Sequence, residues 1–221
     1  MYVYALLNAP TRTLKLPHGI EGPLSLVCVD RLAALVEPLS PECLPQDGDR
    51  LLEAVLAHDR VLRHLFQQTS ILPLPFLRTF FSEAGLREQL STQQQHYLGA
   101  LAQLEGKVEY QLTLTPIERS EPTFPTTLTG KNYFLAKKQH YQAQQSQQIQ
   151  QQQELEAIVR LLQQLPARFS IEQGQASVEH IYLLVDKNEE RLHQHLQAAQ
   201  LKCEHWQLTI GEALPPFHFV G

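Results

Sequence analysis

Val108-Glu-Tyr-Gln-Leu-Thr-Leu114 is the clearest strand pattern in this chain of 221 residues. Apolar and polar residues alternate along it, which is typical of a strand with one buried and one solvated face. A segment with apolar residues at helical spacing precedes it, from Ser82 to Leu104, and Gly106 stands where a glycine often ends a helix. The stretch therefore predicts a long helix followed by a half-buried strand.

Helices and strands continue to alternate after this strand. The spacing predicts a long helix over 131–165, a strand over 178–185, a short helix over 189–199 and a strand over 203–210. A short strand near 168–171 is possible, and the segment 116–129, rich in Pro, Thr, Ser and Glu, is expected to be a long loop. This order, α-β-α-β-α-β from Ser82 onward, predicts a variant of the ferredoxin-like sheet with a long helix.

The first 80 residues predict a second, smaller set of elements. Strands are expected over 2–7, 24–29 and 33–36, and a helix over 49–67 whose buried stripe is Leu51, Leu52, Val55, Leu56, Leu62, Leu65 and Phe66. Two prolines make 71–76 an edge strand or an extended loop, because each removes a ladder donor. We therefore predict an α+β protein with a small mixed α/β domain over residues 1–80 and a ferredoxin-like domain over 81–221.

Composition and charge place the chain among ordinary globular proteins. Hydrophobic residues make up 43% of it and the net charge is −5, so nothing attracts it to nucleic acid or to an anionic membrane. We expect no membrane span, since no apolar run approaches the length of one, and a cytosolic location. Three cysteines without a CxxC pair are expected to be reduced thiols, with Cys28 buried in a strand.

The candidate chemical groups do not assemble into a catalytic or metal-binding pattern. His58 and His64 are six residues apart on a predicted helix and point in different directions, so we expect no shared metal ion. His58 is instead expected to be a polar group at the surface or an interface, with Asp59 and Arg63 as a possible helical ion pair. No nucleophile elbow, phosphate loop or zinc motif occurs. We predict no enzyme, no cofactor and no metal.

A glutamine-rich tract, residues 139–153, fills the middle of the predicted long helix. It is either a tolerated low-complexity expansion on a solvated helix or an arm that binds partners through its side-chain amides. Sustained coiled-coil heptads are not present, because the glutamines interrupt them.

Seven segments, in order, resemble the gas vesicle protein family GvpF/GvpL. They are Tyr2-Val-Tyr-Ala-Leu-Leu7, Ala34-Leu-Val-Glu-Pro38, Ala57-His-Asp-Arg-Val-Leu62, Ile71-Leu-Pro-Leu-Pro-Phe76, Gly106-Lys-Val-Glu-Tyr110, Gly130-Lys-Asn-Tyr-Phe-Leu-Ala-Lys137 and Leu214-Pro-Pro-Phe-His-Phe219. Together they cover nearly the whole chain. One departure follows Leu74, where the family usually continues with a basic residue, Phe and Gly-Thr. The compact length favours GvpF within the family.

The resemblance implies a minor gas vesicle component that is needed for assembly, with two domains and no catalytic residues. A vesicle wall subunit exposes an apolar face, and a partner that shields it must offer apolar surface of its own. The expected partners are the wall protein and other accessory proteins. We predict that the candidate contact residues are Leu74, Phe76, His58, Phe217 and Phe219. The same residues could instead seal the interface between the two domains.

A ferredoxin-like regulatory module that binds a small molecule is the alternative function. It requires a pocket lined by convergent polar groups, and the sequence offers no such set.

Overall fold

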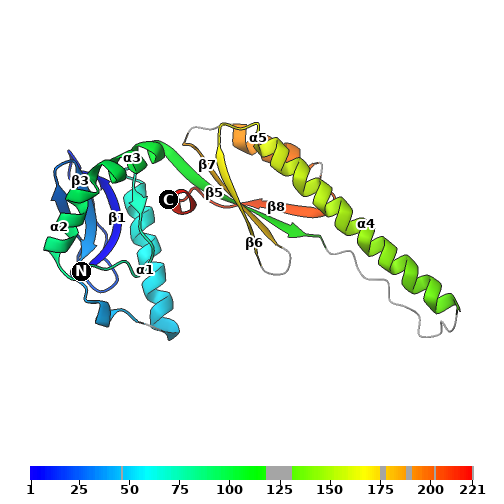
Figure 1. Cartoon of the computed structure of the whole chain (residues 1–221), viewed down its shortest axis with the longest axis horizontal. Coiled ribbons are helices and arrows are strands. Elements are labelled where there is room, and N and C mark those ends of the chain that lie inside the picture. The colour runs from blue at the N-terminus through cyan, green and yellow to red at the C-terminus, as the bar shows by residue number, and fades with distance from the viewer. Residues whose placement is uncertain (46, 118–130, 175–177, 188–190, 202, 221) are drawn as a thin grey trace. The chain divides into compact units, whose positions relative to one another are not determined.

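The computed structural model of the chain describes residues 1–45, 47–117, 131–174, 178–187, 191–201 and 203–220. Its contacts divide the chain into two compact units, Met1–Glu109 with Ala213–Gly221, and Tyr110–Glu212. Each unit contains one four-stranded sheet, and helices pack on both sheets (Figure 1). The mixed α+β class predicted from the sequence is confirmed.

The sheet of the first unit has the strand order β2-β3-β1-β4. Its members are β1 (Tyr2–Asn8), β2 (Ser25–Val29), β3 (Leu32–Glu37) and β4 (Leu72–Pro73). β1 pairs antiparallel with both β3 and β4. β4 lies at an edge and is only two residues long, as expected for a segment whose prolines cannot donate to a ladder.

β1 forms the centre of this unit because both of its faces are covered. All six residues from Tyr2 to Leu7 are buried. Helix α1 (Gly48–Phe66) and helix α3 (Gln94–Leu104) both contact it. The register with β3 shifts between Val3 and Ala5, which leaves Tyr4 at a bulge. A bulge changes the direction of a side chain, and the Tyr4 ring at this bulge packs against His58.

The buried face of α1 differs from the stripe predicted from the sequence. The buried residues are Ala54, Ala57, His58, Val61, Leu62, Leu65 and Phe66. Leu52 and Leu56, predicted to be buried, are 58% and 59% exposed. The contact face is rotated towards two alanines and a histidine, which leaves large apolar side chains on the outer side of the helix.

The helix predicted over residues 82–104 is two helices. α2 (Glu83–Thr92) begins at Ser82, whose side chain accepts a hydrogen bond from the Gly85 N–H at 3.1 Å, as an N-cap residue does. The chain leaves helical geometry at Gln93, and α3 follows. Gly106 has φ +70°, a conformation that favours glycine after a helix.

The contact division falls later than the domain boundary expected at residue 80. Helix α2 contacts β2, and α3 contacts β1, β3 and β4. Leu86, Leu90, Leu101 and Leu104 are all buried. Both helices therefore belong with the first sheet, because their apolar residues complete its core. The division into domains over 1–80 and 81–221 stays a prediction.

The second unit follows the ferredoxin-like plan. Its elements are β5 (Lys107–Pro116, from Tyr110), α4 (Lys131–Leu162), β6 (Arg168–Gln173), β7 (Glu179–Asp186), α5 (Arg191–Gln200) and β8 (Trp206–Ile210). This β-α-β-β-α-β order forms a sheet with the strand order β6-β7-β5-β8. The predicted ferredoxin-like variant is confirmed, and the possible strand near 168–171 is β6. Most of the predicted loop at 116–129 lies outside the described residues.

Helix α4 is anchored by its carboxyl-terminal half. Ile158 and Leu162 are buried, and the Trp206 indole N–H donates to the Gln151 carbonyl oxygen at 2.9 Å. Its amino-terminal half, in which the glutamine tract begins, extends beyond the sheet (Figure 1). Tyr133 and Phe134 are exposed there.

Cys28 is exposed, not buried as predicted. It lies on β2, where side chains alternate between the two faces of the sheet: Val27 is buried, and Cys28 on the other face meets solvent.

Candidate partner-binding site

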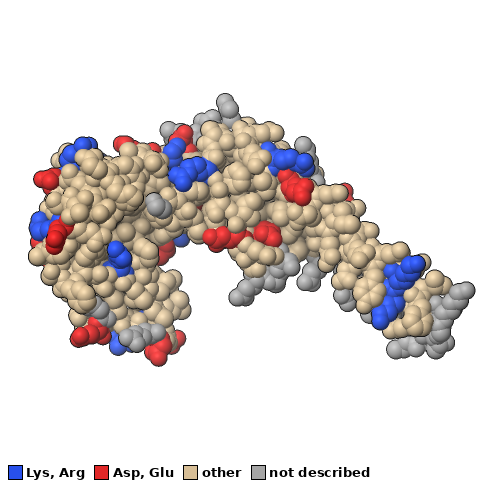
Figure 2. Space-filling model, in the orientation of Figure 1, with Lys and Arg blue, Asp and Glu red and all other residues tan. Residues whose placement is uncertain are grey.

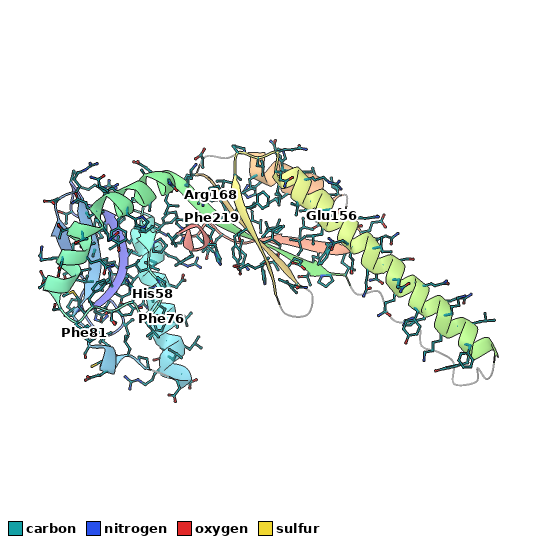
Figure 3. All side chains as sticks on the ribbon, viewed as in Figure 1. His58, Phe76, Phe81, Glu156, Arg168 and Phe219 are labelled. Carbon is teal, nitrogen blue, oxygen red and sulfur yellow. The ribbon has the colours of Figure 1, made fainter. Side chains whose placement is uncertain are left out.

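His58 on α1 lies in a cage of aromatic side chains. The Tyr2 hydroxyl is 2.7 Å from His58 Nδ1, and the Tyr4 ring stacks on the imidazole with ring centroids 5.2 Å apart. Phe76 meets the imidazole edge-on at 5.7 Å (Figure 3). His58 is only 5% exposed. The expectation of a polar histidine at a surface is therefore wrong, because the aromatic residues of β1 and the 71–76 segment enclose it.

Burial sets the ionisation of this cage. It lowers the pKa of His58 to about 4, and the hydrogen bond with the Leu74 backbone and the nearby Asp59 charge oppose the shift only in part. Burial also raises the pKa of both tyrosines. At neutral pH the imidazole is neutral, and its Nδ1 accepts a hydrogen bond from the Tyr2 hydroxyl. His58 is thus a structural link between α1, β1 and the 71–76 segment.

Glu37, at the end of β3, is a second buried polar group. Its carboxylate accepts the Tyr4 hydroxyl at 2.5 Å and the backbone N–H groups of residues 20–22 at 2.5 to 2.9 Å. Gly19 packs so closely on this carboxylate that a Cβ at position 19 would clash with it. Four donors therefore hold one carboxylate and tie the 19–22 loop to the sheet.

The carboxyl-terminal tail is fixed by a buried acid of the same unit. Glu109 is fully buried, and it accepts the His218 backbone N–H at 2.9 Å and lies 2.6 Å from His218 Nδ1. Glu109 and Leu214 also exchange both backbone hydrogen bonds, at 3.0 and 2.8 Å. Phe217–Phe219 forms a short 3₁₀ turn, not an extended segment. His218 is exposed within this turn, and Phe217 and Phe219 on either side of it are half-buried.

We expect His218→Ala to lower the free energy of unfolding by about 1.5 kcal/mol, because Glu109 keeps the backbone donor but loses the imidazole. Urea denaturation at neutral pH measures this loss. His193→Ala, at an exposed position on α5, is the matched control and is expected to change stability by less than about 0.5 kcal/mol. Equal stabilities of the two variants would contradict the role assigned to His218.

The predicted contact residues fall into two groups. His58, Leu74 and Phe76 come together, since the Leu74 N–H donates to the Tyr4 carbonyl oxygen at 2.9 Å beside the cage. Phe217 and Phe219 belong to the Glu109 anchor instead. Leu74, Phe76, Phe217 and Phe219 are all half-buried, whereas His58 is not accessible to a partner.

Other exposed apolar residues of the first unit were missed by the sequence reasoning. We call Leu52, Val55 and Leu56 the outer face of α1. Leu77 and Phe81 are also exposed, and Phe81 is fully so. Phe81 directly precedes the Ser82 N-cap, where an apolar residue often packs on the following helix, but here it does not. The spacing of residues in the sequence does not indicate that Phe81 is fully exposed, and only the tertiary structure shows it.

Charged residues on the first unit are dispersed. Figure 2 shows acidic and basic side chains interspersed over the visible face, with broad uncharged areas between them. The predicted pair of Asp59 and Arg63 is present at 2.6 Å. Within the described residues, no three His, Cys, Asp or Glu side chains are placed to hold a metal ion, and no helix is long and apolar enough to cross a membrane.

One protein family has a sequence model that matches residues 1–221, the gas vesicle synthesis protein GvpL/GvpF family. The chain belongs to the GvpL/GvpF family. No curated protein sequence matches it. The resemblance of the seven segments is therefore confirmed over the full length.

Two solved structures of GvpF proteins share the fold of this GvpL/GvpF chain. The GvpF from Anabaena sp. PCC7120 superposes with a TM-score of 0.76 at 14% identity, over 100% of this chain and 95% of that one. The GvpF from Microcystis aeruginosa gives a TM-score of 0.71 at 13% identity, over 100% and 98% of the two chains. At these identities the likeness shows the fold alone. The description of the GvpL/GvpF family names gas vesicle synthesis and does not name a catalysed reaction.

Proposed function

We propose that this GvpL/GvpF protein binds the apolar wall protein of the gas vesicle and supports vesicle assembly in the cytoplasm. The family match over the whole chain carries the proposal. A wall subunit with an apolar face aggregates in water unless another surface covers it. Binding, and not catalysis, is the activity that such a role requires.

The first unit offers a surface that suits this role. Leu52, Val55 and Leu56 lie on successive turns of α1, on the side that does not face the sheet. Two residues after Leu56, on the opposite side of the same helix, the His58 imidazole packs edge-on against the Phe76 ring. The His58 cage thus fixes the 71–76 segment, and the outer face of α1 supplies accessible apolar contacts. In this proposal His58 positions contact residues and does not touch the partner.

Capture on immobilised wall protein tests the proposal. We expect Leu52→Ser/Leu56→Ser to reduce capture by at least about tenfold, since central apolar contacts dominate binding energy. Leu201→Ser is the matched control, because Leu201 is 89% exposed but lies in the second unit. Unchanged capture by a folded Leu52→Ser/Leu56→Ser variant would exclude the outer face of α1.

The tail is tested in the same assay with Phe217→Ala/Phe219→Ala. Reduced capture by this variant would add the tail to the contact surface. Unchanged capture by the folded variant would remove Phe217 and Phe219 from the candidate contact residues. Absence of capture by the wild-type chain would overturn the proposed function itself.

The small-molecule alternative finds little support among the described residues. It requires convergent polar groups in an enclosed site. A groove between α4 and β6 has polar side chains in its lining, Gln152, Glu156, Arg160 and Gln163, beside Leu155, Val159 and Ile171, but it is open and not an enclosed site.

A further inference from the structure

The edge of the second sheet at β6 differs from the three other sheet edges. At β2, the Arg87 side chain donates to the Cys28 carbonyl oxygen at 2.8 Å. At β8, the Gln200 side chain accepts the Leu208 N–H at 2.8 Å. β4 has only two residues, one of them Pro73. Side chains or prolines thus blunt three edges, whereas β6 is a six-residue edge strand without proline.

The hairpin between β6 and β7 decides which backbone groups of β6 point outward. The Gly174 N–H donates to the Val178 carbonyl oxygen at 2.7 Å, so this pair is of the hydrogen-bonded kind. Antiparallel pairs alternate, and the register Gln173↔Glu179, Ile171↔Ile181 and Phe169↔Leu183 is therefore of the other kind. The N–H and C=O groups of Phe169, Ile171 and Gln173 face away from β7, towards the side of β6 on which no described strand pairs.

The sequence of β6 is complementary to itself when read antiparallel. Arg168-Phe-Ser-Ile-Glu172 places Ser170 at its centre. If a second copy pairs with Ser170 opposite Ser170, then Phe169 lies opposite Ile171 and Arg168 opposite Glu172, each twice. Aromatic with β-branched pairs and opposite-charge pairs are the combinations that stabilise neighbouring strands. In the same register, the outward backbone groups of Phe169 and Ile171 meet each other and can exchange both hydrogen bonds.

The groove beside this edge has room for the added strand's side chains. Ile171 is 43% exposed and lines an open groove of ≈ 370 Å³ with Leu155 and Val159 of α4. Phe169 and Ile171 point to the same face of the sheet, because they are two residues apart. In the proposed register, Phe169 of the second copy lies opposite Ile171 and thus at this groove. Figure 3 labels Arg168, the first residue of β6, and Glu156 of α4, which also lines this groove.

We propose that two copies of this chain associate through antiparallel pairing of their β6 strands, with Ser170 on the two-fold axis. The β6-containing sheets of the two copies then form one continuous sheet. A two-fold interface is self-complementary, so every contact occurs twice. The edge is short, and the dimer therefore forms at high protein concentration with the affinity of a transient contact. The proposal does not depend on binding of the wall protein.

Sedimentation equilibrium of the full chain, from low micromolar to near-millimolar concentration, measures this association. Arg168→Glu and Glu172→Arg, each alone, are expected to weaken it by at least about tenfold, because like charges then face each other twice. The double variant Arg168→Glu/Glu172→Arg is expected to restore it, since both pairs are reversed. Arg31→Glu and Glu53→Arg make the same charge changes at exposed positions of the first unit and should leave association unchanged.

Disulfide trapping tests the register without any change of charge. In a chain whose three native cysteines are replaced by serine, Ser170→Cys is expected to form a cross-linked dimer on mild oxidation, because opposite residues at a two-fold lie within disulfide reach. Thr209→Cys, exposed on the β8 edge, is the control and should stay monomeric. A monomer at all concentrations without cross-linking, or a dimer insensitive to the charge reversals, would overturn the proposal.

Discussion

Replacing Glu37 with alanine is expected to lower the free energy of unfolding by about 4 kcal/mol. The substitution leaves three backbone N–H groups of the 20–22 segment and the Tyr4 hydroxyl without their shared acceptor. Glu37 is 1% exposed, so water cannot readily replace the carboxylate. Urea denaturation at neutral pH measures the loss, with circular dichroism to show that the variant folds.

Two further variants separate the role of the acceptor from the loss of a side chain. Glu37→Gln keeps one oxygen but turns an amide N–H₂ towards backbone donors, so we expect a loss of about 2 kcal/mol. Glu42→Ala removes an exposed glutamate a few residues away and should cost less than about 0.5 kcal/mol. If Glu37→Ala were as stable as Glu42→Ala, the three backbone hydrogen bonds to Glu37 would not hold the 19–22 loop.

Acidification from pH 6.5 to pH 4 is expected to remove about 3 kcal/mol of stability through His58 alone. Its pKa is lowered from 6.5 to about 4 in the folded chain, chiefly by burial. Below pH 6.5 the unfolded chain binds a proton that the folded chain still excludes, so unfolding becomes easier as pH falls. The stability is fully present above pH 6.5 and is lost by the time pH reaches the folded pKa.

The His58→Gln variant isolates this contribution, because glutamine does not titrate. The free energy of unfolding of the wild type, measured by urea denaturation at several pH values, should fall more steeply between pH 6.5 and 4 than that of His58→Gln. His193→Gln removes an exposed histidine and should keep the wild-type slope. Parallel curves for wild type and His58→Gln would show that His58 titrates alike in the folded and unfolded chains.

Both expected effects concern a framework that holds the proposed binding surface. Glu37 fixes the 19–22 loop to the sheet, and His58 fixes α1 to β1 and to Phe76. The proposed contact residues Leu52 and Leu56 lie on the opposite side of α1 from this buried chemistry. Stability variants and binding variants are therefore different residues, and each can be tested without the other.

Local pattern alone determined most elements of this protein and their order, but not the break at Gln93 that divides the predicted helix over 82–104 into α2 and α3. The alternation in Val108–Leu114 predicted β5, and the helical spacing from Ser82 predicted the start of α2. The two prolines of 71–76 predicted an edge strand or an extended loop, and the edge strand β4 lies there. These features depend on the period of side chains and on missing backbone donors, which adjacent residues fix. The family resemblance rests on the same local segments, and the match over the full length confirms it.

Tertiary structure alone decided which face each element buries and which polar groups meet. His58 pairs with a tyrosine 56 positions away, and Glu109 with a histidine 109 positions away. The helical period is the same whether α1 buries Leu52 or His58, so the sequence pattern could not choose between them. The choice followed from the aromatic residues of β1, which stack on an imidazole and leave the leucines outside. Burial of a polar side chain requires partners from distant strands, and only the folded chain brings those partners together.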